Sequence, residues 1–76
     1  MTAVPPCVAL AAQAYSVPVA SVERVIDHAS GPGLGVMKID LRWLPILQRA
    51  GFDPEEVRSN ACMNIAAGAW ILAWAG

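Results

Sequence analysis

Few side chains in this 76-residue sequence can do acid–base chemistry, and they lie on either side of one glycine-rich stretch. Glu23, Asp27 and the only histidine, His28, precede it, and Asp40 lies at its end. A carboxyl or an imidazole acts as a general acid or base where its surroundings adjust its pKa. Glu23 and Asp27 form a like-charged i, i+4 pair, which we expect to face water. A lone histidine near a helix end more often complements the helix dipole than performs chemistry.

The glycine-rich stretch runs from Ala29 to Asp40, with Gly31, Gly33 and Gly35 in its first part. Glycine adopts positive φ and allows a backbone or a ligand to approach closely, and loops on a rigid scaffold often carry sites. The composition alone favours the alternative, a tight connector between two helices. If the stretch carries a site, Asp40 is a candidate acid. If the stretch is a connector, Asp40 is the polar residue that caps the next helix.

Cys7 and Cys62 are far apart in the sequence. There is no CxxC motif and no second histidine, so we expect no zinc site and no other metal. A disulfide between the two would stabilise the fold by up to roughly 4 kcal/mol in the chain-entropy model, and it would suit a small exported domain. Two buried free thiols explain the spacing equally well.

The composition indicates one small domain over residues 1–76. Hydrophobic residues make up 57% of the chain and charged residues 14%, which is too little charge for a typical disordered segment. The net charge is −1, and the five basic residues are scattered, so we expect no nucleic-acid partner. No leader is visible, because Met1-Thr2 lacks a basic region and the apolar run after it is short.

Apolar periodicity predicts about five short helices and no strand. Asp53 is a candidate N-cap with Pro54 behind it, and Asn60 is a candidate cap for the last helix. That helix is apolar almost all round, so we expect it to lie buried at the centre, with Trp43, Trp70 and Ile71 in the core. It is too short for a membrane span. The predicted helices cover residues 7–15, 19–28, 41–50, 54–59 and 61–75.

Four motifs, taken in order, resemble the lytic transglycosylases of the soluble lytic transglycosylase superfamily. The resemblance is to the small periplasmic members that accompany type IV secretion, conjugation and pilus assembly. It implies an all-α, compact lysozyme-like domain, here shortened at the C-terminus, without a cofactor. The motifs are Ala29-Ser30-Gly31, the segment Leu34–Asp40, Trp43-Leu44-Pro45 and the segment Cys62–Leu72.

The resemblance also implies a reaction. Family members cleave the MurNAc–GlcNAc bond of peptidoglycan with one glutamate, which protonates the glycosidic oxygen and then takes the proton of the 6-hydroxyl, leaving a 1,6-anhydro end. The implied partners are the glycan strand and components of the secretion or pilus machinery, and the implied location is periplasmic or exported. A Cys7–Cys62 disulfide is implied as well. The implied substrate-binding residues are Ser30, Gly35, Met37, Lys38, Ile39 and Asp40.

This chain departs from the family pattern where the chemistry is done. Ala29 stands at the position of the catalytic glutamate, Lys38 stands where glutamine is usual, and Asp40 stands where asparagine is usual. The loop between the first two motifs is also short. The catalytic residue therefore stays unassigned, with Asp40 as the candidate substitute. We expect the Ala29 methyl group to occupy a slot at the end of the second helix that four apolar residues surround: Val25, Ile26, Met37 and Ile39.

Three hypotheses remain open from the sequence. The first is a degenerate transglycosylase-related domain that lacks its acid and binds glycan or a partner. The second is an active enzyme that uses Asp40 or a different register. The third is a helical protein-interaction module with no connection to the cell wall. The absence of a carboxylate at Ala29 opposes the hypothesis of an active enzyme. The combination of Trp43-Leu44-Pro45 with the segment Cys62–Leu72 opposes the hypothesis of an unrelated interaction module.

Overall fold

Prolines mark the starts of four of the five α-helices in the computed structural model, which describes residues 6–75. Helix α1 (Pro6–Ala14) is followed by a turn, and α2 (Val19–His28) begins directly after Pro18. The residue before a proline avoids the α region, so α1 cannot continue into α2. The predicted bounds of both helices are confirmed, to within one residue for α1.

The third predicted helix is divided in two. Residues Leu41–Trp43 form a 3₁₀ turn, η1, and α3 (Leu44–Arg49) follows it. Pro45 lies in the first turn of α3, where a missing N–H removes no intrahelical hydrogen bond. Asp40 caps η1, because its side chain accepts a hydrogen bond from the Arg42 backbone N–H at 2.9 Å. The prediction of a single helix over 41–50 was therefore wrong in its first turn.

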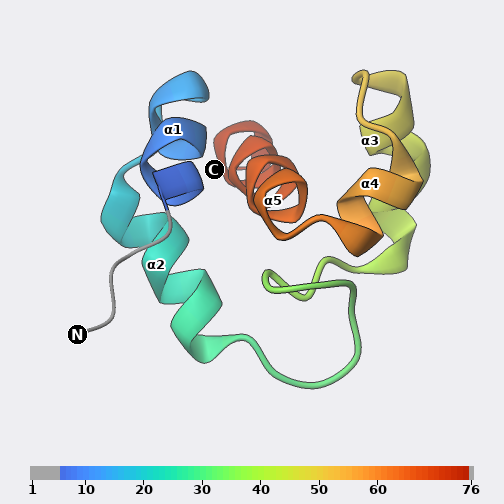
Figure 1. Ribbon diagram of the computed structural model, residues 1–76, viewed down its shortest axis with the longest axis horizontal. Helices are drawn as coiled ribbons and strands as arrows, with labels where there is room; N and C mark the ends of the chain where they lie inside the picture. Colours follow the sequence, from blue (N-terminus) through green and yellow to red (C-terminus); the bar gives the residue numbers. More distant parts are fainter. Residues whose placement is uncertain (1–5, 76) are drawn as a thin grey trace.

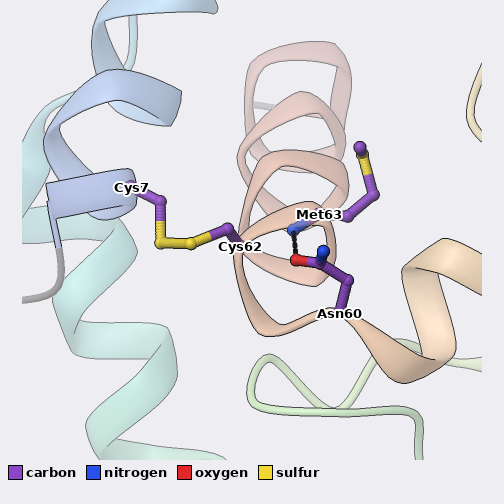
Figure 2. The surroundings of a disulfide bond; sticks show 4 residues. All are labelled: Cys7, Asn60, Cys62 and Met63. Carbon is purple, nitrogen blue, oxygen red and sulfur yellow. Dashed lines mark hydrogen bonds between the residues drawn. A yellow bond between two sulfur atoms is a disulfide. The ribbon is translucent and has the colours of Figure 1, made fainter.

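Helices α4 (Pro54–Ser59) and α5 (Ala61–Ala75) both begin at predicted caps. The Asp53 carboxylate accepts from the Glu55 N–H at 2.9 Å. The Asn60 side-chain oxygen accepts from the Met63 N–H at 3.0 Å, as Figure 2 shows. Each cap satisfies one of the backbone donors that a helix start leaves without an intrahelical partner. Residues 6–75 thus form a small all-α domain, as predicted.

Helix α5 lies in the middle of the fold, with α1 and α2 on one side and α3 and α4 on the other (Figure 1). It packs against α1, α2 and α4. The core is aliphatic: the largest fully buried side chains are Leu47, Ile65, Val8, Val22, Val57 and Asn64.

The prediction that Trp43, Trp70 and Ile71 form the core needs correction. All three are only partly buried and pack against the outside of the aliphatic core. Indole rings are large and are rarely enclosed completely, and a domain of this size has little interior volume to enclose them. The prediction of a central last helix is confirmed.

The two cysteines form a disulfide that joins α1 to the first turn of α5 (Figure 2). The Cα atoms of Cys7 and Cys62 lie 5.4 Å apart, within the usual range for a disulfide. The alternative of two free thiols is therefore wrong. A disulfide is compatible with an exported protein. Within residues 6–75, no helix is both long enough and apolar enough to span a bilayer.

Candidate functional site

The segment between α2 and η1 ends in a tight hairpin formed by residues 34–39, which lies beside α5 (Figure 1). Leu34 and Ile39 form an isolated antiparallel bridge, with N–O distances of 2.9 and 3.0 Å. Inside it, the Lys38 N–H donates to the Gly35 carbonyl at 3.1 Å. Gly35 and Lys38 both have positive φ, at 65° and 48°. The hairpin therefore closes through two residues in the left-handed region.

Asn64, on α5, holds this hairpin in place. Its side-chain oxygen accepts from the Met37 N–H at 2.8 Å, and its amide nitrogen donates to the Leu34 carbonyl at 3.0 Å. The same nitrogen donates to the Val57 carbonyl on α4 at 2.9 Å. Only 1% of Asn64 is exposed. One buried amide therefore connects the hairpin, α4 and α5, and uses three of its four hydrogen-bonding positions.

Two glycines allow the hairpin to lie this close to α5. A Cβ at Gly35 would lie 2.6 Å from Asn64 Cγ, and a Cβ at Gly68 would lie 2.8 Å from Met37 Cγ. Both distances are shorter than real Cβ contacts. Met37 can therefore pack directly onto the α5 backbone, and only 6% of its surface stays exposed.

A pocket of about 240 Å³ opens where the hairpin, α2, η1 and α5 meet. Its floor is apolar, because Met37 and Ile39 are buried there and Val25 enters from α2. Lys38 and Asp40 are the two charged residues of the lining. Within residues 6–75, the lining consists of Val25, Met37, Lys38, Ile39, Asp40, Trp43, Gly68, Ile71 and Leu72.

The structure brings four of the predicted substrate-binding residues together in this pocket: Met37, Lys38, Ile39 and Asp40. Ser30 and Gly35 are exposed and lie outside its lining, because Ser30 follows the end of α2 and Gly35 faces Asn64. The structure therefore does not bring these two residues into the pocket with the other four.

The slot expected around Ala29 is also corrected. Val25, Met37 and Ile39 line the pocket, but Ile26 and Ala29 do not. Ala29 is the partly buried C-cap of α2, and its N–H donates to the Ile26 carbonyl at 3.3 Å. It follows Val25 by four residues, so the two lie on one side of α2, but only Val25 lines the pocket.

Asp40 is tied to Arg42. Its carboxylate accepts from the Arg42 backbone N–H at 2.9 Å and from guanidinium nitrogens at 3.1 and 3.3 Å. The backbone N–H first, and the guanidinium second, lower the pKa of the Asp40 carboxyl. A general acid at neutral pH needs a raised pKa. Asp40 therefore stays ionised, which opposes a role as the substitute acid.

His28 takes no part in the pocket. It is exposed, and its Nδ1 lies 2.9 Å from the Arg24 carbonyl oxygen one turn earlier in α2. This contact keeps the basic side chain at the C-terminal end of α2, where it interacts favourably with the helix dipole.

A row of aromatic rings reaches the pocket from the side, a feature that the sequence analysis missed. Trp43, in the lining, meets Trp74 edge to face at 5.8 Å, and Trp74 stacks on Trp70 at 6.1 Å. Phe52 and Tyr15 continue the row behind Trp70. Spacing on α5 could have indicated part of it, because Trp70 and Trp74 are four residues apart.

Comparison with known proteins gives limited matches. No family model and no solved structure matches the chain. Three curated proteins named "X polypeptide", all from Escherichia coli and one of them from strain K12, are each 40% identical to it over 48 residues. The match covers 63% of this chain and 28% of each relative, so it spans less than a third of the relatives' length.

Proposed function

We propose that this chain is a lytic transglycosylase-related domain that binds the glycan strand of peptidoglycan and does not cleave it. The observation that carries the proposal is which segments of the chain line the pocket. Three of the four motifs each supply part of the lining: residues 34–40, Trp43, and the end of the segment 62–72. Segments from separate elements that converge on one concave, apolar pocket are the usual starting point for a binding-site hypothesis.

The charges of the pocket favour binding over cleavage. Among its lining residues, Asp40 is the one that carries a carboxyl, and its lowered pKa keeps it ionised. At the position where the family carries its glutamate, Ala29 has a methyl group that neither donates nor accepts a proton. A glycosidic oxygen placed here would find no protonated acid, so the bond to the leaving sugar would stay intact.

The size of the pocket limits the ligand. At about 240 Å³ it is smaller than the ~300–1,000 Å³ of a typical small-molecule site. We expect it to hold one sugar ring or its N-acetyl group, with the apolar face against Ile39 and Trp43. The rest of the strand would lie over the exposed surface. Within this proposal the domain works in the periplasm or outside the cell, alongside a secretion, conjugation or pilus machine.

Sedimentation with insoluble peptidoglycan tests the binding. We expect the chain to be retained in the pellet, and chromatography of the supernatant to show no 1,6-anhydro muropeptides. Release of such products by the parent chain would contradict the non-cleaving proposal and favour an active enzyme. If the chain stays in the supernatant, the glycan proposal is rejected in favour of a helical protein-interaction module.

The variant Ala29→Glu tests the missing acid. A glutamate at this position would follow Val25, which lines the pocket, by four residues, and its longer side chain could reach toward the pocket. Loss of a general acid costs ~10²–10⁴ in rate, and a partly exposed carboxyl has a less raised pKa than a buried one. We therefore expect the variant to release 1,6-anhydro ends at a rate about 10²-fold above the background measured with the parent chain. The variant Ala29→Gln, which has the same size but no acid, is the matched control.

A further inference from the structure

The two charged residues of the pocket, Asp40 and Lys38, differ in their ion pairing. Asp40 is already bound by Arg42 through its side chain and its backbone. Lys38 forms no ion pair within residues 6–75, where the two ion pairs are Arg42–Asp40 and Arg58–Glu55. Among the residues that the structure describes, no carboxylate therefore pairs with the Lys38 ammonium group at the pocket.

The backbone fixes the point from which this ammonium extends. Lys38 has φ of 48°, a conformation that is uncommon for a residue other than glycine, asparagine or aspartate. Its N–H is bound to the Gly35 carbonyl, and its neighbours Met37 and Ile39 are buried at 6% and 4% exposure. Non-glycine residues in such conformations cluster at ligand sites. Here the lysine side chain starts from a rigid turn beside an apolar floor.

We infer that the pocket prefers a sugar that carries a carboxylate, which pairs with Lys38 while the apolar part of the sugar lies on Ile39 and Trp43. The inference rests on the proposed function and narrows its ligand. A muramic acid residue with a free lactyl carboxylate has this chemistry. A muramic acid whose carboxyl is joined to a peptide presents a neutral amide at the same point, and it gains nothing from the ammonium.

Two matched sugars test the preference. N-acetylmuramic acid and its lactyl carboxamide have nearly the same size and differ by one negative charge at neutral pH. Titration of the chain with each, followed by NMR of the Trp43 indole and the Ile39 methyl groups, gives two dissociation constants. A solvent-exposed ion pair is worth little, so we expect the acid to bind about two- to fivefold more tightly. The difference should shrink as salt is added, because exposed charges are screened.

Two variants assign the preference to Lys38. Lys38→Asn removes the charge but keeps a residue that tolerates positive φ, so the hairpin should keep its shape and the melting temperature should not fall. Arg49→Gln removes the same charge from an exposed position on α3, away from the pocket. We expect Lys38→Asn to bind both sugars equally and Arg49→Gln to behave as the parent.

The outcomes separate the two proposals. Equal binding of both sugars by the parent chain would overturn the role of Lys38 and leave glycan binding intact. If Lys38→Asn and Arg49→Gln lose the preference for the acid equally, the preference is a general effect of net charge, and the role of Lys38 is overturned. If neither sugar shifts a resonance and the chain does not sediment with peptidoglycan, glycan binding itself is rejected and the role of Lys38 is rejected with it.

Discussion

Asn64 shows how far one residue's role can depend on partners distant in the sequence. The sequence predicts that it lies in a buried apolar helix, and nothing in its neighbourhood indicates what an amide would bind there. Its partners Leu34 and Met37 lie on a loop about thirty positions earlier. A buried amide must be hydrogen-bonded, so a polar residue in an otherwise apolar helix predicts a partner but does not identify it.

Asn64→Ala should lower the free energy of unfolding by about 3 kcal/mol, because the Leu34 and Val57 carbonyls and the Met37 N–H would lose a buried partner. Asn60→Ala is the control. That side chain is an exposed helix cap, so its loss should cost only about 1 kcal/mol. Urea unfolding followed by tryptophan fluorescence measures both. Equal losses in the two variants would show that Asn64 does not hold the hairpin.

Gly35→Ala should destabilise the chain more than Gly31→Ala. Both positions have positive φ, at 65° and 78°, so each substitution costs about 1 kcal/mol in the backbone. Only at Gly35 does the new methyl group collide with Asn64, whereas a Cβ at Gly31 meets nothing within 4 Å. Including the overpacking, we expect a loss of roughly 2–4 kcal/mol for Gly35→Ala. Thermal melts in which the two variants coincide would contradict this packing.

At the scale of elements, the helices were predictable because their ends are set locally. Pro18 and Asp53 mark helix starts whatever the rest of the chain does. The 3₁₀ turn before α3 was not predictable from periodicity, because its three residues are too few to show a period. The hairpin was missed for a related reason: a single bridged pair gives no alternating pattern, and its position depends on α5.

Asp40, at the start of η1, makes the stability of the fold depend on pH. Its pKa is lowered from the ordinary 3.8 in the folded state. A lowered folded pKa means that its contribution to stability is fully present above about pH 3.8 and is lost as the pH falls through the folded value. Asp40→Asn keeps an acceptor for the Arg42 N–H but removes the ion pair. We expect its melting temperature to lie slightly below the parent's at neutral pH.

Melting temperatures of the parent and Asp40→Asn at acidic pH test the direction of this pH dependence. As the Asp40 carboxyl of the parent becomes protonated, the two melting temperatures should converge. Asp27→Asn, which removes an exposed charge from α2, is the control for the change in net charge. A gap between parent and Asp40→Asn that widens toward low pH would contradict the assignment.

At the scale of the molecule, the sequence predicted the all-α class and the central last helix, but it misplaced the tryptophans. Hydrophobicity predicts that indoles leave water, but it does not show whether the fold has room for them. The interior is filled by Leu47, Ile65 and smaller residues, and Trp74 stays 66% exposed. The contact between the hairpin and α5 likewise determines which of the predicted site residues share a pocket. No local sequence pattern indicates that contact.

Reducing the disulfide should lower the stability of the whole domain. Cys7 and Cys62 are 55 positions apart, so the link removes roughly 4 kcal/mol of unfolded-state entropy in the chain-entropy model. For a domain of this size we expect the melting temperature to fall by roughly 15 °C or more. Circular dichroism melts with and without dithiothreitol measure it, and the double variant Cys7→Ser/Cys62→Ser excludes effects of the reductant. Unchanged melts would show that α1 is held to α5 by packing alone.

The disulfide also makes residues 7–62 a closed covalent ring, and the exposed part of the loop after α2 lies within that ring. A protease that cuts between residues 30 and 32 would open the ring without dividing the molecule in two. One piece would keep α1 and α2, and the other would keep the hairpin, held by Asn64. The sulfur link between α1 and α5 would join the two pieces. The loop beside the pocket can therefore be nicked while the walls of the pocket remain attached to one another.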